Sequence, residues 1–308
     1  MLRMPGKSYR GALRPMPAEW EPVRRALEGD VRRLASEIGP RHVGQPERLN
    51  QAAQFIEASL QGAGFASVER QTFTVRGVTC ANLAVERPGA SAPNEILVVG
   101  AHYDTEPFTP GADDNASGVA ALLALARAFV NTTQPRTIRF VAFVNEEMPH
   151  FYTQDMGSFR AARRSRERGE NIVGMLSLES IGYYSTVAHS QRYPAALGAI
   201  YPDTGDFIGF VSNLRSRGLL RRAVQAFRRH AEFPTEAAAL PAFVPGVAWS
   251  DHWAYWKHGY PAIMVTGTAP FRNPNYHRMT DTPDTLDYDR LTRVVSGLAS
   301  VVRELAVG

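Results

Sequence analysis

Cysteine is almost absent from this sequence of 308 residues, since Cys80 is the only one. A single thiol excludes any intrachain disulfide, and it also excludes a metal cluster held by several thiolates. If the protein binds a transition metal, histidine and carboxylate side chains must therefore supply the ligands.

Long apolar runs and a strong net charge are also missing. The sequence has no run of about 18 apolar residues that could span a membrane, and its first residues, MLRMPGKSYRG (1–11), lack the apolar segment of a signal peptide. Lysine and arginine outnumber aspartate and glutamate by only 34 to 30, and the arginines are spread over several expected helices. We therefore expect no membrane span, no nucleic-acid partner and a cytoplasmic location, unless the chain is cut from a longer exported precursor.

The chain does contain an alternation of short apolar runs and helical patterns. This alternation predicts an α/β fold with a mostly parallel, doubly wound central β-sheet flanked by helices. We expect residues 1–17 to form an N-terminal arm and residues 18–308 a single domain, with an extended loop around 183–206. Strands are predicted at residues 68–75, 82–86, 96–99, 137–144, 172–178, 207–211 and 262–265. Helices are predicted at residues 19–38, 46–60, 119–129, 214–230 and 288–305, with a charged helix that ends near residue 168.

Histidine and carboxylate residues lie at or just past the ends of the expected strands, or in loops at the same edge of the sheet. They are His102, Asp104, Asp113, Asp114, Glu146, Glu147, Glu179 and His277. Because ligands of open α/β sheets bind outside the carboxyl ends of the strands, we expect these side chains to converge. Two histidines and several carboxylates suit a pair of divalent ions such as zinc. Glu146 and Glu147 are neighbours at a strand end, so one can bind a metal while the other acts as a base on water.

The motifs that carry these residues occur in a recognisable order. They are GAHYD (100–104), PGADDNASG (110–118), NEE (145–147), SLES (177–180), SDH (250–252) and NPNYHRMTDTPDTL (273–286). Together they resemble metallopeptidase family M28, the zinc aminopeptidases with two co-catalytic metal ions. The resemblance covers about residues 41–305 and implies the zinc-aminopeptidase, or phosphorylase/hydrolase-like, fold.

The resemblance also implies a ligand set. His102 and Glu179 would complete the shell of one zinc ion, Glu147 and His277 that of a second, and Asp114 would bridge the two. The peptide bond between Asp114 and Asn115 is expected to be cis. Two Zn²⁺ ions are the expected cofactors, and other divalent metals would suit the same ligands.

Roles for the residues around the ligands follow from the same resemblance. Glu146 would be the general base and acid, Asp104 would support His102, and Asp251 would support His277, whereas His252 is expected to be structural. Glu179 stands where many family members have aspartate, and segment 148–158 is longer than in compact members. The resemblance does not fix the substrate pocket, for which we expect the aromatic residues Tyr184, Phe243 and Tyr255.

The expected function is a metallo-aminopeptidase that hydrolyses the N-terminal residue of a peptide with a free amine. A glutaminyl-cyclase-like enzyme with one zinc ion and a hydrolase of small amides are alternatives on the same fold. A non-catalytic binding module is a further alternative, but all five ligands and the base are retained, which argues against it. The sequence leaves the oligomeric state open.

Overall fold

The structure is built around one eight-stranded β-sheet with the order β1-β2-β4-β3-β5-β8-β6-β7. The computed structural model describes residues 4–308, apart from the side chains of residues 195 and 196, so residues 1–3 of the expected arm lie outside the described part. The strands are β1 (Glu69–Val75), β2 (Val78–Arg87), β3 (Ala92–His102), β4 (Arg136–Phe143), β5 (Asn171–Glu179), β6 (Ile208–Ser212), β7 (Thr235–Ala239) and β8 (Ala262–Thr266).

The middle of the sheet is parallel. β4, β3, β5 and β8 run in the same direction, whereas β1 pairs antiparallel with β2, β2 with β4, and β6 with β8. The apolar run at the end of β3 is buried because helices cover both faces of the sheet there. The predicted fold class, a mostly parallel sheet flanked by helices, is therefore confirmed.

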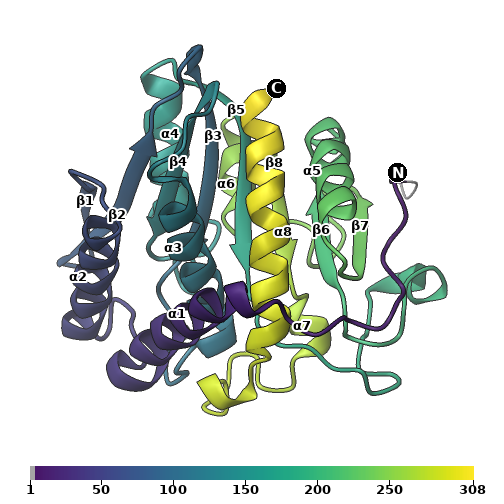
Figure 1. Cartoon of the computed structure of the whole chain (residues 1–308). Helices are drawn as coiled ribbons and strands as arrows, with labels where there is room; N and C mark the ends of the chain where they lie inside the picture. Colours follow the sequence, from purple (N-terminus) through teal and green to yellow (C-terminus); the bar gives the residue numbers. More distant parts are fainter. Residues whose placement is uncertain (1–3) are drawn as a thin grey trace.

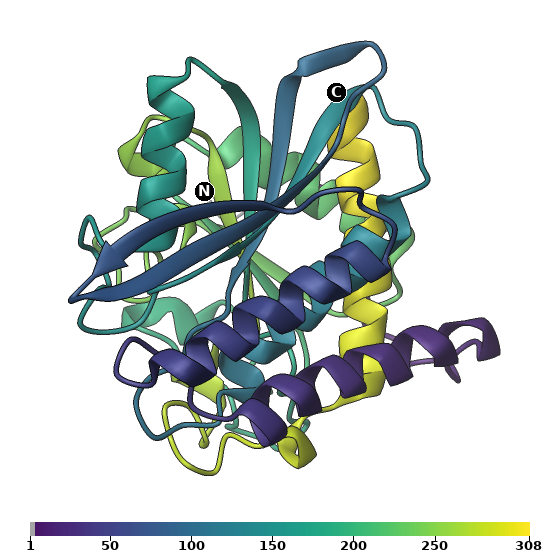
Figure 2. The same ribbon diagram turned by 90° about the vertical axis from the view of Figure 1, so that its left-hand side faces the viewer.

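Helices pack on both faces of the sheet (Figure 1). One face is covered by α2 (Pro46–Gly62), α3 (Gly118–Phe129), α5 (Arg217–His230) and α8 (Tyr288–Val307), and α1 (Glu21–Arg32) packs outside α3 and α8. Figure 2 shows α1 crossing the yellow α8. The other face carries α4 (Gly157–Glu167) and α6 (His252–Lys257), and a short helix α7 (Ala269–Arg272) follows β8.

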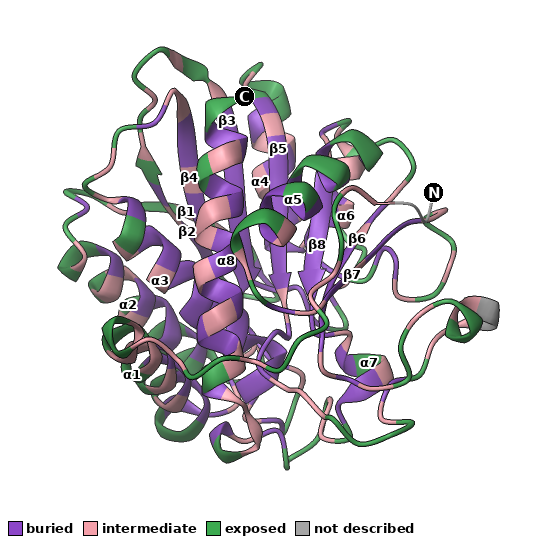
Figure 3. Ribbon diagram, turned by 45° about the vertical axis from the view of Figure 1, so that its right-hand side comes forward, coloured by how far each residue is buried: buried purple, intermediate pink, exposed green. Residues whose placement is uncertain are grey.

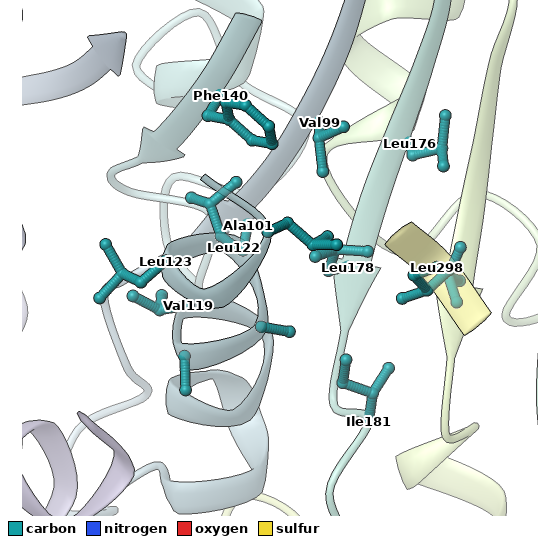
Figure 4. Close-up of a cluster of buried hydrophobic side chains, with 14 of the residues drawn as sticks. Val99, Ala101, Val119, Leu122, Leu123, Phe140, Leu176, Leu178, Ile181 and Leu298 are labelled. Carbon is teal, nitrogen blue, oxygen red and sulfur yellow. The ribbon is translucent and has the colours of Figure 1, made fainter. Parts of the chain in front are cut away.

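The core lies between the sheet and the helices of the first face. In Figure 4, Leu122 of α3 lies toward the strands that carry Phe140 and Val99, whereas Val119 and Leu123 project from the other side of the helix. All five side chains are at most 1% exposed. Figure 3 shows that β5 and β8 are almost wholly buried, while α5 and α8 keep exposed residues on their outer sides. This one-sided burial matches the helical period of their apolar residues.

Three elements differ from the prediction. The connection at 233–247 contains β7, an alanine-rich strand (TEAAA) that lacks the β-branched pattern of an ordinary strand. The short helices α6 and α7 were also not predicted, because neither is long enough to show a period. The tyrosine-rich segment 182–206 is irregular as predicted, apart from a short 3₁₀ turn at Ala195–Ala199 and one isolated bridge between Ser185 and Gly205.

The described part of the N-terminal arm is irregular and lies against β7 and α5. Arg228 donates to the carbonyl oxygens of Pro5 and Gly6, and the backbone N–H of Thr235 donates to the Ser8 hydroxyl. Among residues 4–308, no helix is long and apolar enough to cross a membrane.

Candidate metal centre

The carboxyl edge of the parallel strands carries the predicted site. His102 is the last residue of β3 and Glu179 is the last residue of β5, while Glu146 and Glu147 follow the end of β4. Asp114 lies in the turn Ala112–Ser117, directly before α3. Because β4, β3 and β5 are adjacent and parallel, their ends bring these side chains together.

Asp114 lies between the two histidines. Its Oδ2 is 3.0 Å from Nε2 of His277, and its Oδ1 is 3.4 Å from Nε2 of His102. His102 Nε2 is also 3.4 Å from Oε2 of Glu179, and His277 Nε2 is 3.5 Å from Oε2 of Glu147. The five predicted ligands therefore form two groups that share Asp114.

The backbone around Asp114 is fixed by hydrogen bonds. The peptide bond to Asn115 is cis, in agreement with the prediction. The carboxylate of Asp281 accepts the N–H groups of Asp113 and Asp114, at 2.9 and 3.1 Å. Asn115 donates to the carbonyl oxygen of Leu178, at the end of β5. These contacts hold the Asp114 carboxylate at the edge of the sheet.

Asp104 supports the site in an additional way. Its two carboxylate oxygens accept the N–H groups of Glu146 and Glu147, each at 3.1 Å. Its Oδ1 lies 3.7 Å from Nδ1 of His102, and its carbonyl oxygen is closer to that nitrogen, at 3.3 Å. Asp104 thus lies beside His102 as expected, but its carboxylate mainly orients the turn that carries both glutamates.

The donor set fits divalent metal ions. Oδ1 of Asp114 and Oε1 of Glu147 are buried without a hydrogen-bond partner among the described residues, which is costly for carboxylate oxygens unless a cation neutralises them. Ligand atoms of His102, Asp114 and Glu147 lie within 4.8 Å of one another. Imidazole nitrogens and carboxylate oxygens without thiolates suit zinc and related divalent ions.

The buried side chains of the site shift one another's pKa values. Burial would lower the pKa of His277, but Asp114 and Glu147 outweigh it and raise that pKa to about 11. Burial raises the pKa of Glu147 to about 8 and that of Glu146 well above its usual value. Burial would also raise the pKa of Asp114, but His102 and His277 hold it below the usual value. Metal binding would therefore compete with protons.

Hydroxyl groups hold Glu179 in place. Ser250 donates to Oε2 at 2.7 Å and Ser180 donates to Oε1 at 2.8 Å. Ser177 and Ser250 are also joined by a hydrogen bond of 2.9 Å. These donors fix the longer side chain of glutamate at a position where the resemblance leads one to expect aspartate.

Asp251 lies on the His102 side of the centre, rather than beside His277 as the resemblance implied. Burial raises its pKa to about 7, and the charges that act on it are those of His102, Glu179 and Asp104. The reason is topological, because α6 packs on β5, the neighbour of the strand that carries His102. His252 is fully buried and its Nε2 lies 2.8 Å from the carbonyl oxygen of Val247, away from the metal ligands.

The three expected pocket residues lie elsewhere. Tyr184 packs edge-on against Phe233 in the main core, and Tyr255 packs against Phe143 between the sheet and α6. Phe243 is 86% exposed. The prediction for these residues is wrong because aromatic character alone does not indicate which face of an element a side chain occupies.

Two adjoining cavities lie at the centre. One, of about 180 Å³, is lined by Asp114, Glu146, Glu147, Met148, Phe151, Glu179, Trp249, Tyr276 and His277. The other, of about 110 Å³, shares Glu179, Trp249 and Tyr276 with it and extends toward β6 and β7. Segments 148–158 and 183–206 both contribute wall residues, among them Phe151 and Tyr193.

Two residues at the site were not singled out from the sequence. Glu106 brings a carboxylate oxygen within 4.8 Å of ligand atoms of Glu147 and His277. Glu106 follows His102 and Asp104 at the same spacing of two residues, and this spacing could have indicated from the sequence that it lies at the site. Tyr276 stacks on His277 with ring centroids 3.8 Å apart and lies between the two cavities. Tyr276 directly precedes His277 in the motif, and this position could have indicated its role from the sequence.

Comparisons with known proteins agree with this geometry. The uncharacterized protein YfbL of Escherichia coli K12 is 37% identical to this chain over 285 residues, which cover 90% of this chain and 86% of YfbL. The structure of BSAP, a zinc aminopeptidase from Bacillus subtilis, has a TM-score of 0.73 at 14% identity and covers 96% of this chain and 97% of its own. A glutaminyl cyclase from Porphyromonas gingivalis has a TM-score of 0.69 at 19% identity, and the match covers 92% of this chain and 98% of the cyclase. At these identities the two solved structures share the fold of this chain.

The sequence itself assigns the family. The profile of peptidase family M28 matches residues 82–302. This range includes the five predicted ligands, Glu146 and the three residues that line both cavities. Since this range is well over half of the chain, the protein belongs to peptidase family M28 and is a hydrolase of the metallopeptidase type.

Proposed function

We propose that the protein is an aminopeptidase that removes the N-terminal residue of peptides at a centre holding two zinc ions. The observation that carries this proposal is the position of the Asp114 carboxylate, with one oxygen facing His102 and the other facing His277. A carboxylate shared by two histidine-containing groups can hold two neighbouring ions, the arrangement that two-metal hydrolysis uses.

The proposed ligands form two sets with Asp114 in common. His102 and Glu179 would complete one set, and Glu147 and His277 the other. When bound, the ions supply a water of lowered pKa and polarise the scissile carbonyl group.

Glu146 is the proposed general base. Its carboxylate lies beside the ligands, with Oε2 3.9 Å from His102 Nε2, but it lines the cavity and does not belong to either ligand set. Burial raises the pKa of Glu146 well above its usual value, and a carboxylate with a raised pKa is a stronger base. It would take the proton from the attacking water and give it to the leaving amine.

Tyr276 is proposed to bind the carbonyl oxygen of the substrate. Burial and the nearby carboxylates of Asp114 and Glu147 raise the pKa of its phenol, so the group remains a hydrogen-bond donor. It lines both cavities and therefore faces the place where the reacting group and the side chain of the substrate meet. A fixed donor at this place would stabilise negative charge that develops on the oxygen.

The cavities favour cleavage next to a free N-terminus. The cavity of about 110 Å³ has room for one side chain, and Glu179 at its mouth offers a carboxylate for a substrate ammonium group. A chain that continued on the N-terminal side of the cleaved residue would have to pass this cavity. The proposal therefore requires substrates with a free α-amine.

A cyclase that closes N-terminal glutamine is the second candidate, because the glutaminyl cyclase fold covers 92% of this chain. Such an enzyme would consume glutaminyl peptides without releasing an amino acid. The bridging position of Asp114 and the apolar walls of the cavity support the peptidase.

The test is hydrolysis of aminoacyl-4-nitroanilides by zinc-loaded protein, with N-acetylated analogues and a glutaminyl peptide in parallel. We expect release of 4-nitroaniline from the free-amine substrates only, and loss of release after chelation. Glu146→Gln should lower kcat by ~10²–10⁴-fold with unchanged zinc content, whereas Glu19→Gln on the surface should keep full activity. Cyclisation without 4-nitroaniline release, or full activity of Glu146→Gln, would contradict the proposal.

A further inference from the structure

The cavity of about 110 Å³ lies on the face of the sheet opposite α5 and α8. Its walls come from the irregular segments 191–201 and 240–249 and its floor from β6, β7 and β8. The residues of these strands alternate between the two faces, and Phe210, Ala237 and Val265 point into the core on the other side. The side chains that face the cavity are therefore those of the alternate residues, which include Val211, Glu236, Ala238, Met264 and Thr266.

One row of paired residues crosses this floor. Glu179 of β5 pairs with Thr266 of β8, Thr266 pairs with Gly209 of β6, and Gly209 pairs with Glu236 of β7. Residues paired directly across a sheet point to the same face. The side chain of Glu236 therefore shares the face, and the cavity, of the metal ligand Glu179.

The distance along this row can be worked out from the strand spacing. Three strand intervals of about 4.8 Å place the Cα atoms of Glu179 and Glu236 roughly 14 Å apart. Both carboxylates line the cavity, and Gly209 between them has no side chain to fill the floor. The remaining gap suits a long, extended side chain.

Glu236 is the charged group at the far end of an otherwise largely apolar cavity. The walls near it are formed by Tyr193, Leu197, Tyr201 and Ala238. Glu236 is half-buried, and burial raises the pKa of its carboxyl group, with Arg228 and Arg10 opposing that shift.

No cationic side chain among residues 4–308 lies within ion-pair distance of Glu236. Arg228 instead donates to the carbonyl oxygens of Pro5, Gly6 and Thr235. The Glu236 carboxylate is thus partly desolvated and is not neutralised by a direct ion pair, a situation that a cationic ligand would relieve.

We propose that Glu236 makes the enzyme prefer N-terminal lysine and arginine, with the apolar stem of the side chain against the cavity walls and its cation at the Glu236 carboxylate. This inference rests on the proposed aminopeptidase function and names its substrate class. The α-amine of the substrate would lie beside Glu179, and the basic side chain would follow the row over Thr266 and Gly209. Lysine and arginine combine a long apolar stem with a terminal cation, which matches the order of groups along the cavity.

The test is a comparison of kcat/KM for lysyl-, arginyl- and methionyl-4-nitroanilides with the zinc-loaded full-length enzyme. Methionine is the matched substrate because it is unbranched and uncharged. We expect kcat/KM for the lysyl and arginyl substrates to exceed that for the methionyl substrate by about tenfold or more. Glu236→Gln should remove this advantage, because it should lower kcat/KM by about 10–100-fold for the lysyl and arginyl substrates only.

Two further variants separate charge from structure. Glu236→Lys should reverse the preference and favour a glutamyl substrate over a lysyl one. Glu167→Gln changes an exposed glutamate of α4, whose carboxylate lies 3.5 Å from Arg163, and should leave the substrate preference unchanged.

The outcomes are distinguishable. A methionyl preference that Glu236→Gln does not alter, or an equal loss for all three substrates in that variant, would overturn the role of Glu236 while the aminopeptidase function stands. No release from any of these substrates would overturn the proposed function, and this inference with it.

Discussion

Asp104→Asn tests whether a residue outside the proposed ligand set orients the site. The side chain keeps its size, but it loses its negative charge and one of its two acceptor oxygens. In the wild type those oxygens accept the N–H groups of Glu146 and Glu147, both at 3.1 Å. In the variant an amide group would face one of these donors, so one buried N–H would lose its partner.

The size of the effect follows from these contacts. A hydrogen bond to a charged group contributes about 1.5–3 kcal/mol, and leaving its buried partner unsatisfied adds to the loss. The variant would also remove the negative charge 3.7 Å from Nδ1 of His102. Since supporting residues of metal sites typically change metal affinity or activity by ~10–100-fold, we expect a loss of this order in both.

The assay is zinc content after dialysis against buffered zinc, together with kcat/KM for the best aminoacyl-4-nitroanilide. Asp155→Asn is the matched control, because that aspartate lies in the segment between β4 and α4 and pairs with Arg160, 2.7 Å away, rather than with the site. The control should keep wild-type zinc affinity and activity. If Asp104→Asn does the same while folding normally, the orienting role argued for Asp104 is refuted.

Three other substitutions test separate parts of the structure. Arg41 is fully buried and donates to five backbone carbonyl oxygens, so Arg41→Met should lower the unfolding free energy in urea by about 3–5 kcal/mol, and a loss no larger than that of the exposed Arg33→Met would contradict this. Burial lowers the pKa of His252 from 6.5 to about 4, so the unfolded chain takes up a proton at a higher pH than the folded protein does. The folding stability is therefore unaffected by this residue's titration above pH 6.5 and decreases as the pH falls from 6.5 toward 4. At about 1.4 kcal/mol per unit, this is up to about 3 kcal/mol, and His252→Gln should flatten the stability profile in that window, unlike His189→Gln at the surface. Tyr276→Phe should lower kcat by about tenfold or more with unchanged zinc content, whereas an unchanged kcat would argue against an oxygen-binding role.

The sequence was sufficient to predict the edge of the sheet that carries the site. The apolar runs that became β3, β4 and β5 show where the strands end, and the carboxyl ends of adjacent parallel strands must meet. That argument locates His102, Glu147 and Glu179. His277 comes from a long loop with no period, so only the motif resemblance indicated it.

Residues that depend on packing across the sheet could not be predicted. β7 consists mostly of alanine, which does not indicate a strand. The position of Glu236 on the cavity floor follows from the register of β7 with β6 and could not be predicted from the sequence. The side of the centre on which Asp251 lies depends on where α6 packs. In the same way, the true cavity walls include Tyr193 and Trp249 rather than Phe243, because loop conformation decides which aromatic side chain turns inward.

The central claim is tested most directly by the zinc content of the purified full-length protein, measured by elemental analysis in parallel with 4-nitroaniline release. We expect about two zinc ions per chain, loss of activity when they are removed by a chelator, and recovery when zinc is returned. His277→Ala should lose one of the ions. A single zinc ion in the wild type, or release that survives complete removal of metal, would contradict the account.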